Sequence, residues 1–396
     1  MLSNKIFIGD NLSVMTSSTF EKYRNGIDFI YIDPPYNTKH RFAYNDANDL
    51  WSRDISLRLG SAKSLLTDEG VIFISIDDNE LANLLSIGYQ IFGKENYVGI
   101  FITKQAQRSN AKHINIVHEY VVCFAKNKKK LPKFYIQRIE DPFESDKLLQ
   151  IIEKVNKEFQ SSRKNAEVIL KNAIDKYVRD TGNTWIKNYS NIDEQGRIFF
   201  AKDLSTPGKP SRLIINEIGL ILDPLKSRGW SSKEKILNLH KQNRLCYRNG
   251  RPYAIEYLEE ATNNVPSILD FYSRFGTNDL KKLGLDGVFD TPKPVELIKF
   301  LIRCSQHKDS IILDFYAGSG TTAQAVYEIN KEDNRHHEYV LIQREEFINP
   351  NTEAFIRMQA LGYEQPTVDQ AMLLRINTYL EQNNMNKDYT VEKIEK

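Results

Sequence analysis

Ile27-Asp28-Phe29-Ile30-Tyr31-Ile32-Asp33-Pro34-Pro35-Tyr36-Asn37-Thr38 is an apolar run that stops at an acid and two prolines. Residues 27–32 are predicted to form a buried strand, because apolar runs of this length bounded by turn residues are typical of core strands. Proline cannot donate a hydrogen bond to a neighbouring strand, so Asp33 and Tyr36 should lie in a stiff loop just beyond the strand. In an open α/β sheet, ligands bind outside the carboxyl ends of the strands. The carboxylate, the fixed carbonyl groups and the aromatic ring suit a flat substrate that carries an amino group; a plain proline turn is the alternative.

The size and composition of the chain favour a soluble protein of more than one domain. A chain of 396 residues suggests two or three domains. Hydrophobic residues make up 41% and charged residues 27%, which is ordinary for a globular protein. No apolar stretch approaches the roughly 18 residues needed to cross a bilayer, and residues 1–5 lead into a strand rather than a signal peptide. We therefore expect a cytoplasmic protein without a membrane anchor.

The cysteines exclude two further classes of protein. Cys123, Cys246 and Cys304 are far apart and stand among apolar or basic neighbours. Their spacing matches neither a disulfide framework nor a zinc site, so they are interpreted as buried thiols. No metal site is expected.

Strands and helices alternate over the first 130 residues. Beside the strand at 27–32, the pattern predicts strands at 5–8, 71–76 and 118–126 and helices at 12–23, 46–66 and 81–92. This alternation indicates βαβ units and a mostly parallel sheet.

The middle of the chain has a different character. Apolar residues at helical spacing predict a charged helical hairpin over residues 146–180. From Arg197 to Arg251 there are twelve basic residues against four acids, with Phe199, Phe200, Trp230, Tyr247 and Tyr253 among or beside them. A long basic segment with interleaved aromatic residues is typical of a nucleic-acid-binding surface. A solvated basic surface is the alternative.

A second ligand-binding pattern follows where the sheet resumes. Thr291-Pro292-Lys293-Pro294 precedes a predicted helix, and a strand at 310–313 runs into Asp314-Phe315-Tyr316-Ala317-Gly318-Ser319-Gly320-Thr321-Thr322 and a helix at 323–329. Strand, acid, Gly-Ser-Gly and helix form the first βα turn of many nucleotide-binding sheets. The next strand, 339–342, should supply an acceptor for ribose hydroxyls, and Gln343, Glu345 and Glu346 are the candidates. No Gly-Lys-Thr follows, so a phosphate-binding P-loop is not expected.

The two patterns together resemble the amino-group DNA methyltransferases that use S-adenosylmethionine. Their order, with Asp-Pro-Pro-Tyr first, a basic middle and then Thr-Pro-Lys-Pro and the glycine loop, is similar to the permuted β group. Further stretches resemble the modification (Mod) subunits of type III restriction systems: 70–78, 118–126, 251–253, 289–298 and 311–346. The resemblance covers most of residues 1–130 and 245–350.

This resemblance implies an α/β fold with a Rossmann-like, doubly wound, mostly parallel sheet (a permuted class I methyltransferase) and an inserted target-recognition region. The implied domains are a catalytic half at 1–130 and an insert at 131–250, which holds the helical hairpin and the basic target-recognition region. A cofactor-binding half at 251–350 and a helical tail at 351–396 follow.

The resemblance also implies roles for single residues. The catalytic motif corresponds to Asp33, Pro34, Pro35 and Tyr36. The cofactor-binding positions correspond to Asp10, Lys293, Pro294, Asp314, Phe315, Gly318, Ser319, Gly320, Thr321, Thr322, Gln343 and Glu345. Gln343 stands where many relatives have an acid, so the choice of ribose acceptor among Gln343, Glu345 and Glu346 stays open.

The implied reaction is transfer of a methyl group from S-adenosylmethionine to N6 of an adenine flipped out of double-stranded DNA. Asp33 in the motif favours adenine, because relatives that methylate cytosine N4 more often have serine there. The alternatives are an N4-cytosine methyltransferase, a catalytically silent DNA-specificity subunit and an RNA methyltransferase. A homodimer and a restriction (Res-like) subunit are the partners that the resemblance suggests. Neither a nuclease nor a helicase is expected, because their metal-binding and phosphate-binding motifs are missing from the sequence.

Overall fold

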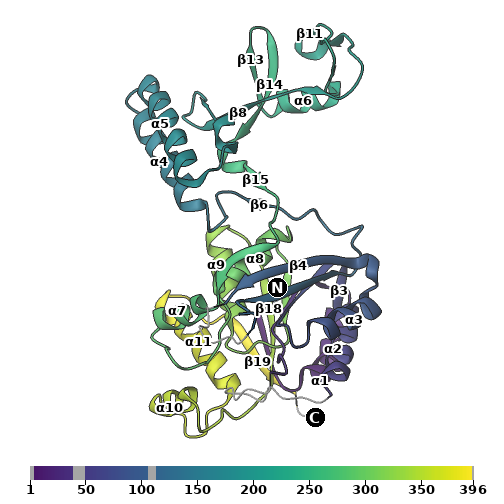
Figure 1. Ribbon diagram of the computed structural model, residues 1–396, viewed down its shortest axis with the longest axis vertical. Coiled ribbons are helices and arrows are strands. Elements are labelled where there is room, and N and C mark those ends of the chain that lie inside the picture. The colour runs from purple at the N-terminus through teal and green to yellow at the C-terminus, as the bar shows by residue number, and fades with distance from the viewer. Residues whose placement is uncertain (1–3, 39–49, 106–112, 395–396) are drawn as a thin grey trace. The chain divides into compact units, whose positions relative to one another are not determined.

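The chain folds into two compact units. The computed structural model describes residues 4–38, 50–105 and 113–394 (Figure 1). One unit comprises residues 1–135 and 264–396, and the other is Ile136–Asn263. Residues 1–3 of the expected amino-terminal segment and residues 46–49 of the predicted helix lie outside the described residues.

The first unit is built on a large sheet with the strand order β16-β4-β5-β3-β2-β17-β18-β1-β19, which has nine strands in the described residues. The bounds are β1 Asn4–Ile8, β2 Ile27–Ile32, β3 Leu66–Ile76, β4 Tyr97–Lys104, β5 His118–Ala125, β16 Ile268–Tyr272, β17 Ile311–Asp314, β18 Glu338–Gln343 and β19 Tyr389–Lys393. Only β5 runs antiparallel to its described neighbours, β3 and β4; the other described neighbours pair in parallel. The predicted mostly parallel α/β sheet is confirmed.

Helices cover both faces of this sheet (Figure 1). On one face, Ile30 and Ile32 of β2 belong to a core with residues of α1, α2 and α3. On the other face, the rings of Phe29, Phe73 and Phe101 form a chain that reaches Phe300 of α8. The bounds are α1 Asn11–Thr16, α2 Trp51–Leu65, α3 Leu81–Phe92, α7 Arg274–Lys282, α8 Val295–Cys304, α9 Thr321–Glu332, α10 Glu353–Ala360 and α11 Val368–Gln382, with short 3₁₀ helices at Ser18–Tyr23 and Lys94–Asn96.

Two predictions about this unit were wrong in detail. The helix predicted at 12–23 ends at Thr16, because Ser17 is extended, and continues as the 3₁₀ helix Ser18–Tyr23. The tail predicted as a helix contains α10 and α11 but ends in β19, which pairs in parallel with β1. Of the apolar residues in this segment, Tyr389 is buried but Val391 is exposed. The segment is therefore a strand because its backbone pairs with β1, and not because its sequence is an apolar run.

The second unit contains the predicted helical hairpin and a small antiparallel sheet. The hairpin consists of α4 (Ser145–Phe159) and α5 (Arg163–Thr181), and the Ser162 side chain accepts a hydrogen bond from Asn165 N to cap α5. The sheet has the order β13-β14-β8-β7. The remaining bounds are β6 Ile136–Gln137, β7 Asn191–Ile192, β8 Ile198–Asp203, β9 Ser205–Thr206, β10 Leu213–Ile215, β11 Leu220–Leu222, β12 Gly229–Trp230, α6 Lys233–Lys241, β13 Leu245–Arg248, β14 Arg251–Tyr257 and β15 Thr262–Asn263, with 3₁₀ helices at Trp185–Asn188, Asn216–Ile218 and Leu258–Glu260.

The boundary predicted at residue 250 lies too early in the chain. Residues 251–257 were assigned to the cofactor-binding half, but they form β14, which pairs with both β8 and β13 of the second unit. β15 then pairs with β6, so the second unit extends to Asn263. Pairing with β8 and β6, which lie much earlier in the chain, decides where the second unit ends. The one local sign that residue 250 is not a boundary is the Asn249-Gly250 turn, which joins β13 to β14 as a hairpin.

Within the described residues, we find no helix with both the length and the apolar character that a membrane span needs.

Candidate active site

The sheet changes its winding direction between β2 and β17, which are neighbours in the middle of the sheet. Phe29 pairs with Ile312 and Ile30 with Leu313. The next strand after β2 in this part of the sheet is β3 on one side, and the next after β17 is β18 on the other. Asp33 follows β2 and Asp314 ends β17, so the two predicted motifs meet at the switch point, where α/β sheets bind ligands.

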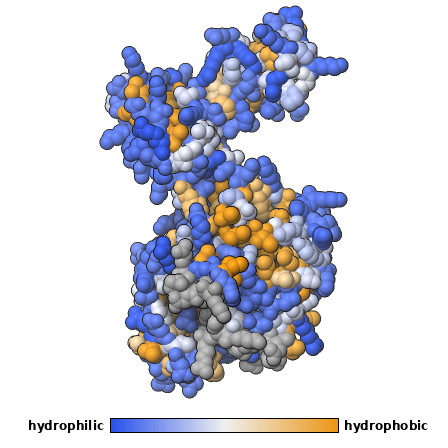
Figure 2. Space-filling view, in the orientation of Figure 1, coloured by the Kyte–Doolittle hydropathy of each residue, from blue (hydrophilic) through white to orange (hydrophobic). Residues whose placement is uncertain are grey.

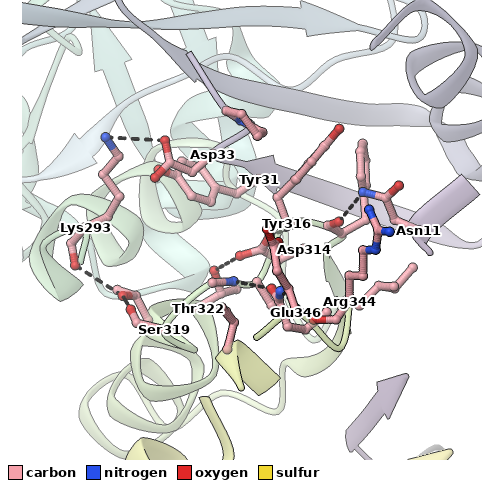
Figure 3. Close-up of a pocket in the computed structure, with 18 of the residues that line it drawn as sticks. Asn11, Tyr31, Asp33, Lys293, Asp314, Tyr316, Ser319, Thr322, Arg344 and Glu346 are labelled. Carbon is pink, nitrogen blue, oxygen red and sulfur yellow. Dashed lines mark hydrogen bonds and ion pairs between the residues drawn. The ribbon is translucent and has the colours of Figure 1, made fainter. Parts of the chain in front are cut away.

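A cavity of about 670 Å³ opens at this point (Figure 3). Most of the predicted site residues line it: Asp10, Asp33, Pro35, Lys293, Asp314, Phe315, Gly318, Ser319, Thr321, Thr322, Gln343 and Glu345. Four others are their chain neighbours and are not on the described wall: Pro34, Tyr36, Pro294 and Gly320. The sequence prediction therefore collected residues that the fold brings to one place.

Asp314 organises the glycine loop. Its Oδ1 accepts a hydrogen bond from Tyr316 N at 3.0 Å, and its Oδ2 accepts one from Thr322 Oγ1 at 2.6 Å. Burial raises the pKa of Asp314 to about 7, although these two hydrogen bonds oppose the rise. Gly318 and Gly320 have φ values of 51° and 77°, in the left-handed region that favours glycine. The loop therefore depends on its acid and on both glycines.

The three candidate ribose acceptors make different contacts. Gln343 Oε1 accepts a hydrogen bond from Gly318 N at 2.8 Å, so this side chain holds the glycine loop. Glu345 forms an ion pair with Lys393 of β19. Glu346 also lines the cavity, and its backbone carbonyl accepts from Val368 N.

Asp10 is tied to a residue that the sequence analysis missed. Asp10 caps α1 by accepting from Ser13 N at 3.0 Å and forms an ion pair with Arg58 Nη2 of α2 at 2.9 Å. Burial alone would raise the pKa of Asp10, but the bonds from Ser13 and Arg58 outweigh it and lower the pKa. Asn11, the neighbour of Asp10, donates to Phe315 O at 2.8 Å. Arg58 lies on a predicted helix without a motif, so no sequence signal identified it.

Lys293 contacts the Asp-Pro-Pro-Tyr loop as well as the glycine loop. Its carbonyl accepts from Thr321 Oγ1 at 3.2 Å. Its ammonium lies 3.3 Å from Asp33 Oδ1 (Figure 3). The same ammonium lies 2.7 Å from Tyr36 Oη. Tyr36 Oη donates to Asp33 Oδ1 at 2.7 Å. The ammonium also donates to Glu119 Oε2 of β5 at 2.7 Å. The assignment of Lys293 to the cofactor side alone is therefore incomplete, and Glu119 was missed.

The charges in this cluster shift one another. Burial raises the pKa of Asp33; the Lys293 ammonium opposes this rise and the Glu119 carboxylate adds to it. Burial alone would lower the pKa of Lys293, but Asp33 and Glu119 outweigh it and raise the pKa above its usual value. Lys293 is therefore charged at neutral pH.

Arg375 supports the glycine loop from α11 and was also missed. This buried side chain donates to Ser319 Oγ at 2.9 Å, to Thr321 Oγ1 at 2.7 Å and to Gln324 Oε1 at 3.1 Å. Burial lowers its pKa to about 10, which leaves it charged at neutral pH. The contact joins residues more than 50 positions apart, so only the fold reveals it.

Acids outnumber bases on the cavity wall. The charged residues on the described wall are six acids and three bases: Asp10, Asp33, Asp54, Asp314, Glu345, Glu346, Arg58, Lys293 and Arg344. Among residues 4–38, 50–105 and 113–394, no group of three or more His, Cys, Asp or Glu is arranged to hold a metal ion.

Comparison with known proteins identifies the family. The chain is 29% identical to the EcoPI Mod subunit of a type III restriction-modification enzyme from Escherichia phage P1, over 91% of this chain and 60% of that protein. It is 28% identical to the type II methyltransferase M.KpnI from Klebsiella pneumoniae, over 86% of this chain and 80% of that protein. The chain thus spans only about 60% of the length of the first Mod subunits that it matches.

Among solved structures, TTHA0409 from Thermus thermophilus in complex with S-adenosyl-L-methionine matches with a TM-score of 0.44 and 11% identity, over 98% of each chain. A family model described as DNA methylase matches residues 27–365. Because that match covers most of the sequence, the chain belongs to the DNA methylase family.

Proposed function

We propose that this chain transfers a methyl group from S-adenosylmethionine to N6 of an adenine that is flipped out of double-stranded DNA. The observation that carries the proposal is the meeting of two loops at one cavity. Asp33 and the glycine loop extend from neighbouring strand ends, so an amine and a methyl donor could be held side by side.

The cavity suits S-adenosylmethionine in size and charge. A volume of about 670 Å³ falls within the usual range of small-molecule sites. An excess of acids on the wall favours a ligand with a cationic sulfonium and opposes one with several phosphates. Asp10, Glu345 and Glu346 would accept hydrogen bonds from hydroxyl and amino groups, and the Gly318–Thr322 segment lets a ligand approach the backbone. When bound, the cofactor supplies an already activated methyl group.

Asp33 and its loop would orient the target amine. Asp33 and the carbonyl of Pro34 would accept the two hydrogens of the exocyclic amine and draw its lone pair toward tetrahedral geometry. Tyr36 would stack on the flipped ring. The raised pKa of Asp33 also suits this carboxylate to receive a proton from the developing ammonium.

The second unit is proposed to contact the DNA around the target. Part of its basic segment is paired internally, as Lys202 is with Glu256 and Arg251 is with Asp203. Lys226 and Lys241 are exposed and have no ion pair among the described residues, so they are available to phosphates. We therefore propose that methyl transfer takes place in the first unit and that the second unit contacts the DNA.

We further propose that the chain is the modification component of a restriction-modification system. The support is its similarity to proteins named as type III Mod subunits. A restriction subunit and a second copy of this chain would be the protein partners.

The test is methylation of DNA by the purified chain with isotopically labelled S-adenosylmethionine, followed by mass spectrometry of the nucleosides and sequencing of the modified sites. We expect N6-methyladenine within one recognition sequence. Detection of N4-methylcytosine would instead support the alternative that the chain is an N4-cytosine methyltransferase. Binding of the cofactor and of DNA without any modified base would indicate a silent specificity subunit.

A further inference from the structure

We infer that Glu119 is a positioning residue that retains the Lys293 ammonium when the target amine displaces it from Asp33, so that Asp33 can accept that amine. This inference rests on the methyl transfer proposed above and deepens it. Neither the motif resemblance nor the family match assigned Glu119 a role.

The topology explains why a residue of β5 reaches this site. β5 is antiparallel to β3, and Tyr120 pairs with Ile76, the last residue of β3. The amino-terminal end of β5 therefore lies at the same sheet edge as the carboxyl ends of the parallel strands. Glu119, one residue earlier than Tyr120, stands at this edge although no strand-end acid was expected there.

The distances show two carboxylates competing for one cation. Lys293 Nζ lies 2.7 Å from Glu119 Oε2 and 3.3 Å from Asp33 Oδ1. Tyr36 Oη also lies within 3.4 Å of Glu119 Oε2. All three charged side chains are at most 28% exposed, so these interactions are only weakly screened by water.

The competition has a direct consequence for the substrate. A target amine needs lone pairs of Asp33 that the Lys293 ammonium and the Tyr36 hydroxyl now contact. Because Glu119 already binds Lys293 at the shorter distance, the ammonium can leave Asp33 without becoming a buried, unpaired charge. Without Glu119, Asp33 would be the remaining carboxylate partner of Lys293 in the cluster, and the amine would have to displace it.

Other ionisable groups around Asp33 act in the same field. They are Tyr36 on its own loop, Tyr31 on β2, Asp314 at the end of β17 and, facing Glu119, Asp77 after β3. Glu119 also raises the pKa of Tyr36 and of Asp77, and Lys293 lowers the pKa of Tyr31. The direct effect of each substitution on Asp33 still has a definite sign. Loss of the Glu119 charge lowers the pKa of Asp33, and loss of the Lys293 charge raises it.

The experiment compares Glu119→Gln, Lys293→Met and the double variant with the parent chain in DNA methylation. For Glu119→Gln we expect kcat to fall by about tenfold or more, with the affinity for S-adenosylmethionine within about twofold of the parent. The acid limb of the kcat/KM profile should move to lower pH in Glu119→Gln and to higher pH in Lys293→Met. The double variant should turn over faster than Glu119→Gln, because no ammonium is left to occupy Asp33.

Glu21→Gln, an exposed acid paired with Arg24 in the same unit, is the matched control and should behave like the parent. Thermal unfolding checks that each variant is folded, and Glu119→Asp, which keeps the charge, should retain more activity than Glu119→Gln. Unchanged kcat and an unmoved acid limb in folded Glu119→Gln would overturn the inference.

A second measurement does not depend on activity. Titration of [γ-¹³C]Asp-labelled protein by NMR should show a lower pKa for Asp33 in Glu119→Gln than in the parent, and an equal or higher value overturns the inference. If the parent chain methylates no DNA while this shift is observed, the proposed function fails and the positioning of Lys293 by Glu119 stands.

Discussion

At the scale of single residues, three groups converge on Asp33. Tyr36 and Lys293 both contact its Oδ1, and Glu119 binds the Lys293 ammonium at 2.7 Å. The motif alone describes Asp33 as an acceptor for an amine. The contacts describe a carboxylate whose ionisation and availability are controlled by neighbours from three parts of the chain.

Replacement of Asp33 by alanine should abolish methyl transfer. The variant loses the acceptor that orients the amine, so we expect turnover to fall by about 10²-fold or more, with little change in DNA binding. Isotope incorporation measures the first effect and fluorescence anisotropy the second. Asp68→Ala, which removes an exposed acid paired with Lys130, is the control. Turnover retained in Asp33→Ala would rule out its assigned role.

His337 should make the protein sensitive to acid. It is buried, its Nδ1 accepts from Ser310 N, and burial lowers its pKa to about 4, whereas an unfolded histidine has a pKa near 6.5. Below about pH 6.5 the unfolded state therefore takes up a proton that the folded state resists. This contribution to stability is complete above pH 6.5 and is lost as the pH falls toward 4, by up to about 3 kcal/mol.

His337→Asn should flatten that dependence, because the amide oxygen can still accept from Ser310 but does not titrate. Denaturant unfolding between pH 4 and pH 7 measures the slope. His336→Asn, at the exposed neighbouring position, should keep the parent slope. Equal slopes in the parent and in His337→Asn would show that another group controls acid unfolding.

At the scale of elements, the glycine loop depends on helix α11 beneath it. Arg375 of α11 bonds to Ser319 and Thr321, and a Cβ on Gly320 would lie 3.0 Å from Met372 Cγ. The sequence predicted only a helical tail at 351–396, with no role in the site. In the structure α11 is instead the support of the proposed cofactor loop.

Gly320→Ala should therefore impair cofactor binding as well as stability, whereas replacement of another left-handed glycine should reduce stability alone. Gly320 has a φ of 77°, and Gly284 in the same unit has a φ of 74° with open space where a Cβ would be placed. Both alanine variants should lose about 1 kcal/mol or more of stability from backbone strain. Only Gly320→Ala should also weaken the binding of S-adenosylmethionine, by about tenfold, as calorimetry would measure. Equal affinities in the two variants would contradict the role of this loop.

At the scale of the whole molecule, we propose that the first unit carries out methyl transfer and that the second unit contacts DNA. Substitutions in the second unit should therefore change DNA binding without changing cofactor binding. Lys226→Ala with Lys241→Ala should reduce the salt dependence of DNA binding, by about one unit of slope for each lost phosphate contact, and should leave cofactor affinity unchanged. Binding measured across salt concentrations provides the slope. Lys147→Ala with Lys157→Ala, on the exposed face of α4, is the control. A slope unchanged in the first pair would place the DNA contacts elsewhere.

The surface of the second unit that is visible in Figure 2 is mostly hydrophilic, as a DNA-contacting surface requires, but it is not uniformly so. Figure 2 shows hydrophilic residues over most of the visible face of the second unit, with apolar patches between them. Exposed apolar side chains of that unit include Ile214, Ile221 and Tyr247. The salt dependence of DNA binding tests the contribution of the charged residues and does not test these apolar patches.

The sequence by itself determined the parts of this protein that are written in local patterns. Apolar runs that end in acids marked β2 and β17, and Gly-Ser-Gly marked the loop before α9, because strand ends and left-handed turns need particular residues at adjacent positions. The family resemblance to DNA methyltransferases came from those same stretches, and the family match bears it out.

The tertiary structure alone decided which other side chains reach the site. Glu119 enters because β5 runs antiparallel to its neighbours, Arg58 because α2 packs beside α1, and Arg375 because α11 folds back under the glycine loop. It also decided that residues 251–263 belong to the second unit and that β19 completes the sheet edge. Apart from the β13–β14 hairpin at Asn249-Gly250, each depends on pairing or packing between segments far apart in the chain, which requires no local spacing of residues and leaves none visible.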